Sequence, residues 1–182
     1  MNLSGKKIYL SEGLAEEHYP LVLHAFNDLE VVKYFSSAKR ALGLSDISEL
    51  KAFLKWWETG PILEMYTNDD AFIGYTSLSD ISSGDECEFS VFILDKNYWG
   101  KGIAKEATLL TLGHAFRDLG MKKVTLETSE FHENALRLYE KVGFKKVKVI
   151  PNDRTVFHNG EWILSGSIIM EIKSDDFLGS SL

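Results

Sequence analysis

Apolar residues recur along the chain with two different spacings, and together they predict strands that alternate with helices. Short apolar or alternating runs bounded by turn-forming residues are typical of strands. Such runs cover residues 7–10, 62–67, 71–78, 86–94, 123–129, 145–150, 155–164 and 167–173, of which 155–164 is a hairpin. Apolar residues spaced three and four apart are typical of helices. This spacing covers residues 14–35, with a break, and residues 46–60, 103–119 and 134–142.

Polar clusters between these runs predict the turns. Asn68-Asp69-Asp70 and Ser82-Ser83-Gly84-Asp85 each join two antiparallel strands, and Asn159-Gly160 is a strong signal for a tight hairpin. The segment 36–44 is expected to be a loop. The polar residues 174–182 are expected to form a mobile tail.

The order of these elements defines the expected fold class. It runs strand, two helices, three antiparallel strands, helix, strand, helix, and then two or more strands. A strand–helix–strand unit across residues 86–129 requires one parallel pair inside an otherwise antiparallel sheet. We therefore expect a single α+β domain over residues 1–173, built on a mixed, mostly antiparallel sheet of about six to seven strands with about four helices.

Charge and composition narrow the class of partner. The 182 residues carry a net charge of −7 and are 45% hydrophobic, which suits one domain with its own core. No basic stripe is present, so we expect no nucleic-acid partner, whereas a cationic amine would suit an acidic surface. No apolar run is long enough to span a membrane, and the first residues lack the apolar run of a signal peptide, so we expect a cytoplasmic protein. The histidines are scattered without metal-ligand spacing, so we expect no metal site.

The junction between the strand 86–94 and the following helix is the most informative segment. It reads Tyr-Trp-Gly-Lys-Gly-Ile-Ala over Tyr98–Ala104. A glycine turn that opens a helix aims unpaired backbone N–H groups at one point, which favours a phosphate. The spacing does not fit a Walker loop, and Lys105 stands where a dinucleotide fingerprint needs its third glycine. An ordinary strand-to-helix turn without a ligand is the alternative interpretation.

This segment resembles the acetyl-CoA loop of the GNAT family of N-acetyltransferases, whose motif is Gln/Arg-x-x-Gly-x-Gly/Ala. Asn97 stands where the family prefers Gln or Arg, a departure that is common in the branch that acetylates protein N-termini. A second segment supports the first: Asn134 followed by Tyr-Glu-Lys-Val-Gly-Phe over Tyr139–Phe144 resembles the closing motif of the family. The resemblance covers nearly the whole chain and is firmest from Glu88 to Phe144.

The resemblance implies acetyl-CoA as co-substrate and assigns residues to it. A bulge near the end of the strand 86–94 would splay the sheet and free a backbone N–H group for the developing oxyanion. The pantetheine arm would pair with that strand at Phe92, Ile93 and Leu94. Asn134 would cap its helix through its side chain and contact the coenzyme. The pyrophosphate would lie on Trp99, Gly100, Lys101, Gly102, Ile103 and Ala104.

Acetyl transfer to an amine needs a base, because an alkyl ammonium has a pKa of about 10.4, and it benefits from an acid at the leaving thiolate. The family places a tyrosine near the coenzyme sulfur, which makes Tyr139 the expected acid, although its helical spacing also suits core packing. Glu127 is the first candidate base by resemblance, with a solvated strand carboxylate as the alternative. Glu88, on the neighbouring strand, is the second candidate, and the choice between the two stays open.

The sequence therefore predicts an acetyl-CoA-dependent N-acetyltransferase that acts by direct transfer in a ternary complex. Its acceptor would be a primary amine on a small molecule, an amino sugar, a polyamine or a protein N-terminus. The ribosomal-protein alanine acetyltransferases are the branch it resembles, and homodimers are common in the family. A non-catalytic acyl-CoA-binding sensor or interaction module is the alternative. The acceptor, the acyl-chain preference and the oligomeric state stay open.

Overall fold

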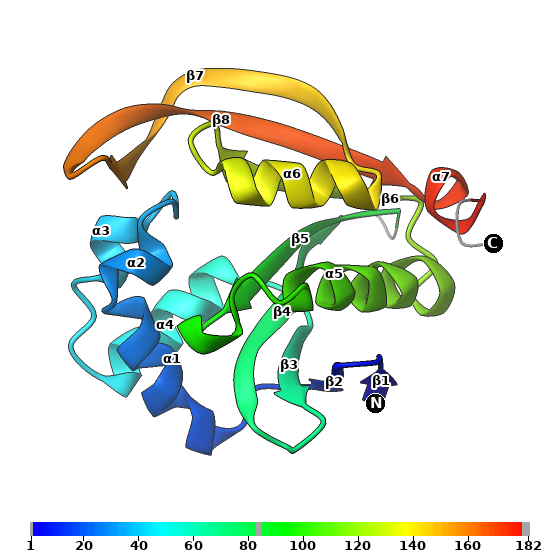
Figure 1. The fold of residues 1–182 in the computed structure, drawn as a ribbon, viewed down its shortest axis with the longest axis horizontal. Coiled ribbons are helices and arrows are strands. Elements are labelled where there is room, and N and C mark those ends of the chain that lie inside the picture. Colours follow the sequence, from blue (N-terminus) through cyan, green and yellow to red (C-terminus); the bar gives the residue numbers. More distant parts are fainter. Residues whose placement is uncertain (1, 83–84, 180–182) are drawn as a thin grey trace.

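The computed structural model describes residues 2–82 and 85–179, which form one mixed sheet with helices on both faces (Figure 1). Residues 83–84 of the turn expected at 82–85 lie outside the described residues, as do residues 180–182. The described strands are β1 (Asn2–Ser4), β2 (Ile8–Glu12), β3 (Ile62–Thr67), β4 (Phe72–Ser82), β5 (Glu86–Ile93), β6 (Lys123–Ser129), β7 (Lys145–His158) and β8 (Glu161–Lys173). The described α-helices are α1 (Tyr19–Phe26), α2 (Leu29–Val32), α3 (Ala38–Ala41), α4 (Ile47–Trp57), α5 (Ile103–Gly113), α6 (Glu133–Val142) and α7 (Ser174–Gly179).

The order of the eight described strands is β1-β2-β3-β4-β5-β6-β8-β7, and the one parallel pair is β5 with β6. This confirms the mixed, mostly antiparallel sheet. The parallel pairing is short, running from Glu86 opposite Lys123 to Glu88 opposite Thr125. From Phe89 to Ile93, β5 is paired with β4 alone.

The expected bulge near the end of β5 is not there. The register between β4 and β5 is continuous from Glu88 to Ile93. The sheet opens because β5 and β6 diverge after Glu88, without an extra residue in either strand. The backbone of β5 beyond Glu88 therefore has one edge without a neighbouring strand.

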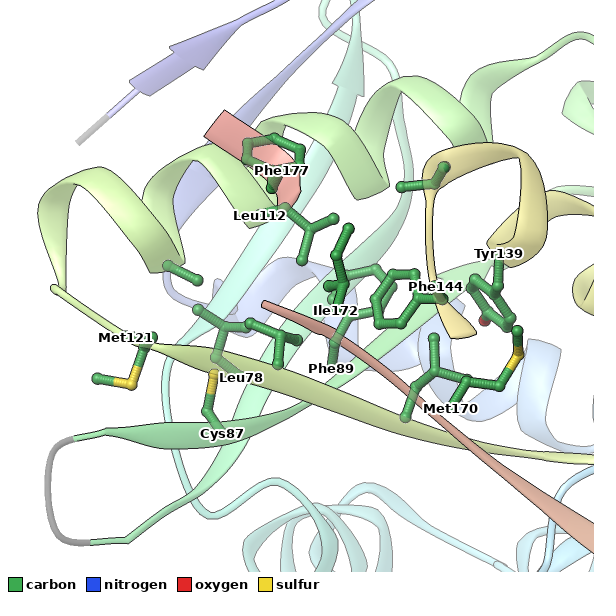
Figure 2. Packing of buried hydrophobic residues seen from close by; sticks show 14 of the residues in the cluster. Leu78, Cys87, Phe89, Leu112, Met121, Tyr139, Phe144, Met170, Ile172 and Phe177 are labelled. Atoms are coloured by element: carbon green, nitrogen blue, oxygen red, sulfur yellow. The ribbon is translucent and has the colours of Figure 1, made fainter. Parts of the chain in front are cut away.

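Of the three hydrophobic clusters among the described residues, two pack helices against the sheet around β5. On one face, Leu112 of α5 and Tyr139 of α6 pack with Phe89 of β5 (Figure 2). On the other face, Phe26 and Phe53 from α1 and α4 pack with aromatic residues of the sheet. Since successive side chains of a strand point to opposite faces, Phe89 faces α5 and the alternate residues of β5 face α1–α4. Glu88 is thereby directed to the α1–α4 face.

The C-terminal part differs from expectation in two ways. The segments 145–150, 155–164 and 167–173 form two long strands, because Asn159 and Gly160 turn the chain at φ values of 51° and 89° and two register shifts keep β7 on β8. Residues 174–179 of the expected mobile tail form α7 instead. Phe177 anchors this helix, since it is buried with its ring 5.3 Å from that of Phe116.

Two N-terminal segments also differ. The first strand of the chain is β1, which pairs with β2 and adds an edge strand that the pattern did not show. The segment 36–44, expected to be a loop, contains α3, whose Ala38 and Ala41 are buried.

The helix expected over 103–119 is α5 continued by a π-helical turn, His114–Asp118.

Candidate active site

The glycine loop, residues 98–104, leads from β5 into α5. Gly100 and Gly102 have φ values of 72° and 79°, a left-handed conformation that strains any residue with a side chain. The indole Nε1 of Trp99 donates to the Ile93 carbonyl at 2.9 Å, which ties the loop to the end of β5. The ammonium of Lys7 donates to the Lys101 carbonyl at 2.7 Å, which ties it to the start of β2.

The loop presents backbone donors at the start of a helix. Glu106 makes the first hydrogen bond of α5, from its amide to the Gly102 carbonyl at 3.2 Å. The amides of Ile103, Ala104 and Lys105 therefore have no partner within the helix. A Cβ atom placed on Gly100 would meet no heavy atom within 4 Å. Open backbone, unpaired amides and the positive end of a helix dipole fit a pyrophosphate.

Lys7 adds a cation to this loop that the sequence did not reveal. Its Nζ atom would lie 3.5 Å from a Cβ atom on Gly102. Lys7 also borders a cavity of about 400 Å³ beside the loop, together with Lys101 and Tyr98. Lys7 is far from the loop in sequence, so only the packing of α5 over β2 brings the two together.

The edge of β5 bears on the expected contacts of the pantetheine arm. The Leu94 amide is already bonded to the Ile73 carbonyl at 2.9 Å. Because hydrogen bonds alternate along an antiparallel strand, Phe92 also directs its backbone to β4, while Val91 and Ile93 direct theirs away from it. The backbone groups of Phe92 and Leu94 are thus directed to β4, which disfavours the expected pairing of the arm with them, whereas those of Val91 and Ile93 lie on the open edge of β5.

Tyr139 and Asn134 lie on α6. Tyr139 is 9% exposed, its ring packs edge-on against Phe144 at 5.7 Å, and burial raises the pKa of its phenol (Figure 2). The phenol is therefore protonated at neutral pH and can act as a donor. Asn134 is exposed and is the second residue of α6, whose N-cap position is taken by His132. Its expected capping role is wrong, because the helix begins one residue earlier than the pattern indicated.

Glu127 on β6 is held in an ion pair. Nη2 of Arg154 makes a short contact with its Oε1 atom, and the Ser167 hydroxyl lies 3.1 Å from the same oxygen. Arg154 is 7% exposed, donates from Nε to Ser167 at 2.8 Å, and has its pKa lowered to about 10 by burial. Arg154 lies where β7 shifts register against β8, in a stretch that the sequence pattern placed between two strands. No motif indicated it.

Glu88 on β5 has a different environment. Burial raises the pKa of its carboxyl group, the neighbouring Asp80 and Glu58 raise it further, and Arg154 opposes them. Glu88 lines a pocket of about 220 Å³, the acidic pocket, on the α1–α4 face. Other described residues in its wall are Trp56, Trp57, Thr59, Ser79 and Asp80. The structure thus separates the two candidate bases: Glu127 is ion-paired, and Glu88 borders a space that an acceptor could enter.

None of the described helices is long and apolar enough to cross a membrane. In the same residues, no group of three or more His, Cys, Asp or Glu side chains is arranged to hold a metal ion.

Comparison with known proteins identifies the family. Residues 11–145 match the family model described as the acetyltransferase (GNAT) domain. The chain belongs to the GNAT acetyltransferase family. The family and fold expected from the glycine loop and the closing motif are therefore confirmed. The ribosomal-protein alanine branch stays an expectation.

Relatives in the GNAT family resemble the chain over different lengths. The probable N-acetyltransferase YjcK of Bacillus subtilis is 32% identical over 96 residues, which is 52% of this chain and 52% of that protein. This chain thus matches about half the length of that relative. A GNAT-family acetyltransferase from Bacillus anthracis has a TM-score of 0.76 at 15% identity, covering 96% of this chain and 99% of that one. Spermidine N-acetyltransferase from Vibrio cholerae, in complex with CoA and spermine, has a TM-score of 0.77 at 20% identity, covering 93% and 98%.

Proposed function

We propose that this GNAT protein transfers the acetyl group of acetyl-CoA to a primary amine, directly within a ternary complex. The observation that carries the proposal is the divergence of β5 and β6 after Glu88, beside a glycine loop that opens α5. Binding of CoA and a polyamine in the spermidine N-acetyltransferase, which has the same fold, supports this use of the site. We also expect the protein to act in the cytoplasm.

Three parts of the chain would hold the coenzyme. The amides at the start of α5 and the ammonium of Lys7 would bind the pyrophosphate. The outward backbone groups of Val91 and the outward amide of Ile93, whose carbonyl accepts from Trp99, would pair with the pantetheine arm as a short added strand. Asn134, exposed on the first turn of α6, would contact the same molecule.

The bound coenzyme supplies a thioester whose carbonyl carbon accepts an amine and whose thiolate leaves. Glu88 would take the proton that the ammonium must lose before it forms the new C–N bond. A backbone amide of the β5 edge would donate to the carbonyl oxygen as charge develops there. As the C–S bond breaks, Tyr139 would donate to the leaving sulfur, which its protonated phenol allows.

Release of free thiol from acetyl-CoA tests the proposal. The purified protein is given acetyl-CoA with spermidine, an aminoglycoside, an amino sugar, or peptides that begin with Ala or Ser. Amine-dependent release is the expected result. Coenzyme binding without release for every acceptor would refute the enzyme and favour a non-catalytic binding module.

A matched pair of variants identifies the base. Glu88→Gln should lower kcat/KM by about 10²-fold or more, the usual range for a general base. Glu127→Gln should lower it less, since that carboxylate is engaged by Arg154. The reverse order would assign the base to Glu127. Coenzyme affinity measured by calorimetry should be unchanged in both variants.

A further inference from the structure

The acidic pocket is walled by tryptophans. Trp57 is fixed by edge-on packing, with its ring 5.1 Å from that of Phe53 and 5.5 Å from that of Phe92. Trp56, beside it on α4, is 59% exposed and carries the guanidinium of Arg40 at 4.6 Å from its ring centroid. Indole surfaces of this kind cover alkyl chains and attract cations.

Carboxylates also line the pocket and lie behind its wall. Asp80 and Glu88 line the pocket from neighbouring strands, and Ser79, which also lines it, lies opposite Glu88 in the β4–β5 register. The Ser79 hydroxyl donates at 3.1 Å to Oε2 of Glu58, a carboxylate that is 8% exposed. Glu58 therefore lies directly behind the pocket wall. Burial raises the pKa of its carboxyl group.

Buried hydroxyl groups surround Glu58. Tyr75 and Ser77 are fully buried, and their hydroxyl groups, with that of Ser79, lower the pKa of the Glu58 carboxyl group by hydrogen bonding, against the effect of burial. The carboxylate is thereby held behind the pocket wall, where its charge acts on Glu88.

We infer that the acidic pocket selects an alkyl amine with at least two positive charges. One ammonium would lie at Glu88, where it is acetylated, and a second would be held by Asp80 in the field of Glu58. The methylene chain between them would lie on Trp56 and Trp57. This inference rests on the proposed function and names its substrate class.

The charge balance favours this class over the other amines. Asp80 and Glu88 line the pocket and Glu58 lies behind its wall, which gives three carboxylates. The ammonium that reacts would neutralise the charge of one of them. None of the described residues in the wall is Lys or Arg, and although the guanidinium of Arg40 lies 4.6 Å from the ring centroid of Trp56, carboxylates outnumber cations around the pocket. Arg154, whose charge acts on Glu88, is already paired with Glu127.

Two acceptors of equal chain length test the inference. Putrescine and butylamine differ only in the second amine. We expect kcat/KM for putrescine to exceed that for butylamine by about tenfold or more, the effect of one charge-assisted contact. Asp80→Asn should bring the two values of kcat/KM to within about twofold of each other, because it removes the contact that only putrescine makes. Asp85→Asn, which removes the same charge from an exposed residue paired with Lys122, should keep it.

The outcomes test the inferred acceptor class separately from the proposed acetyl transfer. Equal kcat/KM for the two acceptors would overturn the inference while leaving the acetyltransferase intact. A preference that survives in Asp80→Asn would overturn the assigned site. Calorimetry of putrescine with the CoA-bound protein adds an arm without turnover: binding that weakens about tenfold in Asp80→Asn would support the pocket even if no acetyl transfer occurs.

Discussion

Replacement of Gly102 by Ala separates a backbone requirement from a ligand requirement at the glycine loop. Gly102 has a φ of 79° and stands at the N-cap position of α5. A side chain at this position costs about 1–2 kcal/mol in the left-handed conformation. The new Cβ atom would meet only Nζ of Lys7, at 3.5 Å, which is an ordinary contact. Backbone strain is therefore the whole expected cost to folding.

The size of the effect can be stated for two assays. A loss of about 1–2 kcal/mol lowers Tm by roughly 2–8 °C in a domain of this length. The same methyl group would stand at the amides that we assign to the pyrophosphate. We expect it to weaken acetyl-CoA binding by about tenfold or more, equivalent to about 1.4 kcal/mol. Thermal unfolding and isothermal calorimetry measure the two quantities on one sample.

Gly120 provides a matched control at the other end of the same helical segment. Its φ is 70°, and a Cβ atom there would meet nothing within 4 Å. Gly120→Ala should lower Tm by a similar amount and leave coenzyme affinity unchanged. If Gly102→Ala lowers Tm but binds acetyl-CoA like the wild type, the pyrophosphate does not lie on this loop and the reasoning is refuted.

Three further predictions use the same structure. Tyr139→Phe keeps the packing against Phe144, so Tm should be unchanged. We expect kcat to fall by about tenfold or more while coenzyme affinity stays the same. An unchanged kcat would show that Tyr139 is not the acid. The pKa of Glu88 is raised, so kcat/KM should fall as pH drops through that pKa. Asp80→Asn removes a negative neighbour of Glu88 while Glu58 and Arg154 remain, so it should move the acid limb of the pH profile of kcat/KM to lower pH. An acid limb at the same pH in the variant would contradict this. The pKa of Glu58 is raised on folding, so its ionisation opposes folding at neutral pH. Glu58→Gln should therefore raise the free energy of unfolding at pH 7, with the gain lost below the ordinary glutamate pKa of about 4.3. A variant that is less stable than the wild type at neutral pH would count against this.

Local patterns made the fold and the glycine loop predictable. The turn at Asn159-Gly160, the parallel pair around residues 86–129 and the left-handed glycines follow from short-range preferences that tertiary packing leaves unchanged. Asn134 shows the limit of such patterns, since a helix start displaced by one residue removed its capping role.

Contacts between distant segments could not be predicted in this way. Arg154 reaches Glu127 across the β6–β8–β7 part of the sheet, and Lys7 reaches the loop from β2. In the sequence, Glu58 is an acidic residue that no motif singles out. It directly follows α4, and its burial depends on how α4 packs beside β4. The choice between Glu88 and Glu127 depended on these contacts, which is why the sequence left it open.

Hydrogen–deuterium exchange with and without acetyl-CoA tests most directly where the coenzyme binds. We predict slower exchange on binding at the amides of residues 99–105 and at those of Val91 and Ile93, with no change in α7 at residues 174–179. Slower exchange confined to other segments, with residues 99–105 unchanged, would contradict the site on which the proposed acetyl transfer depends.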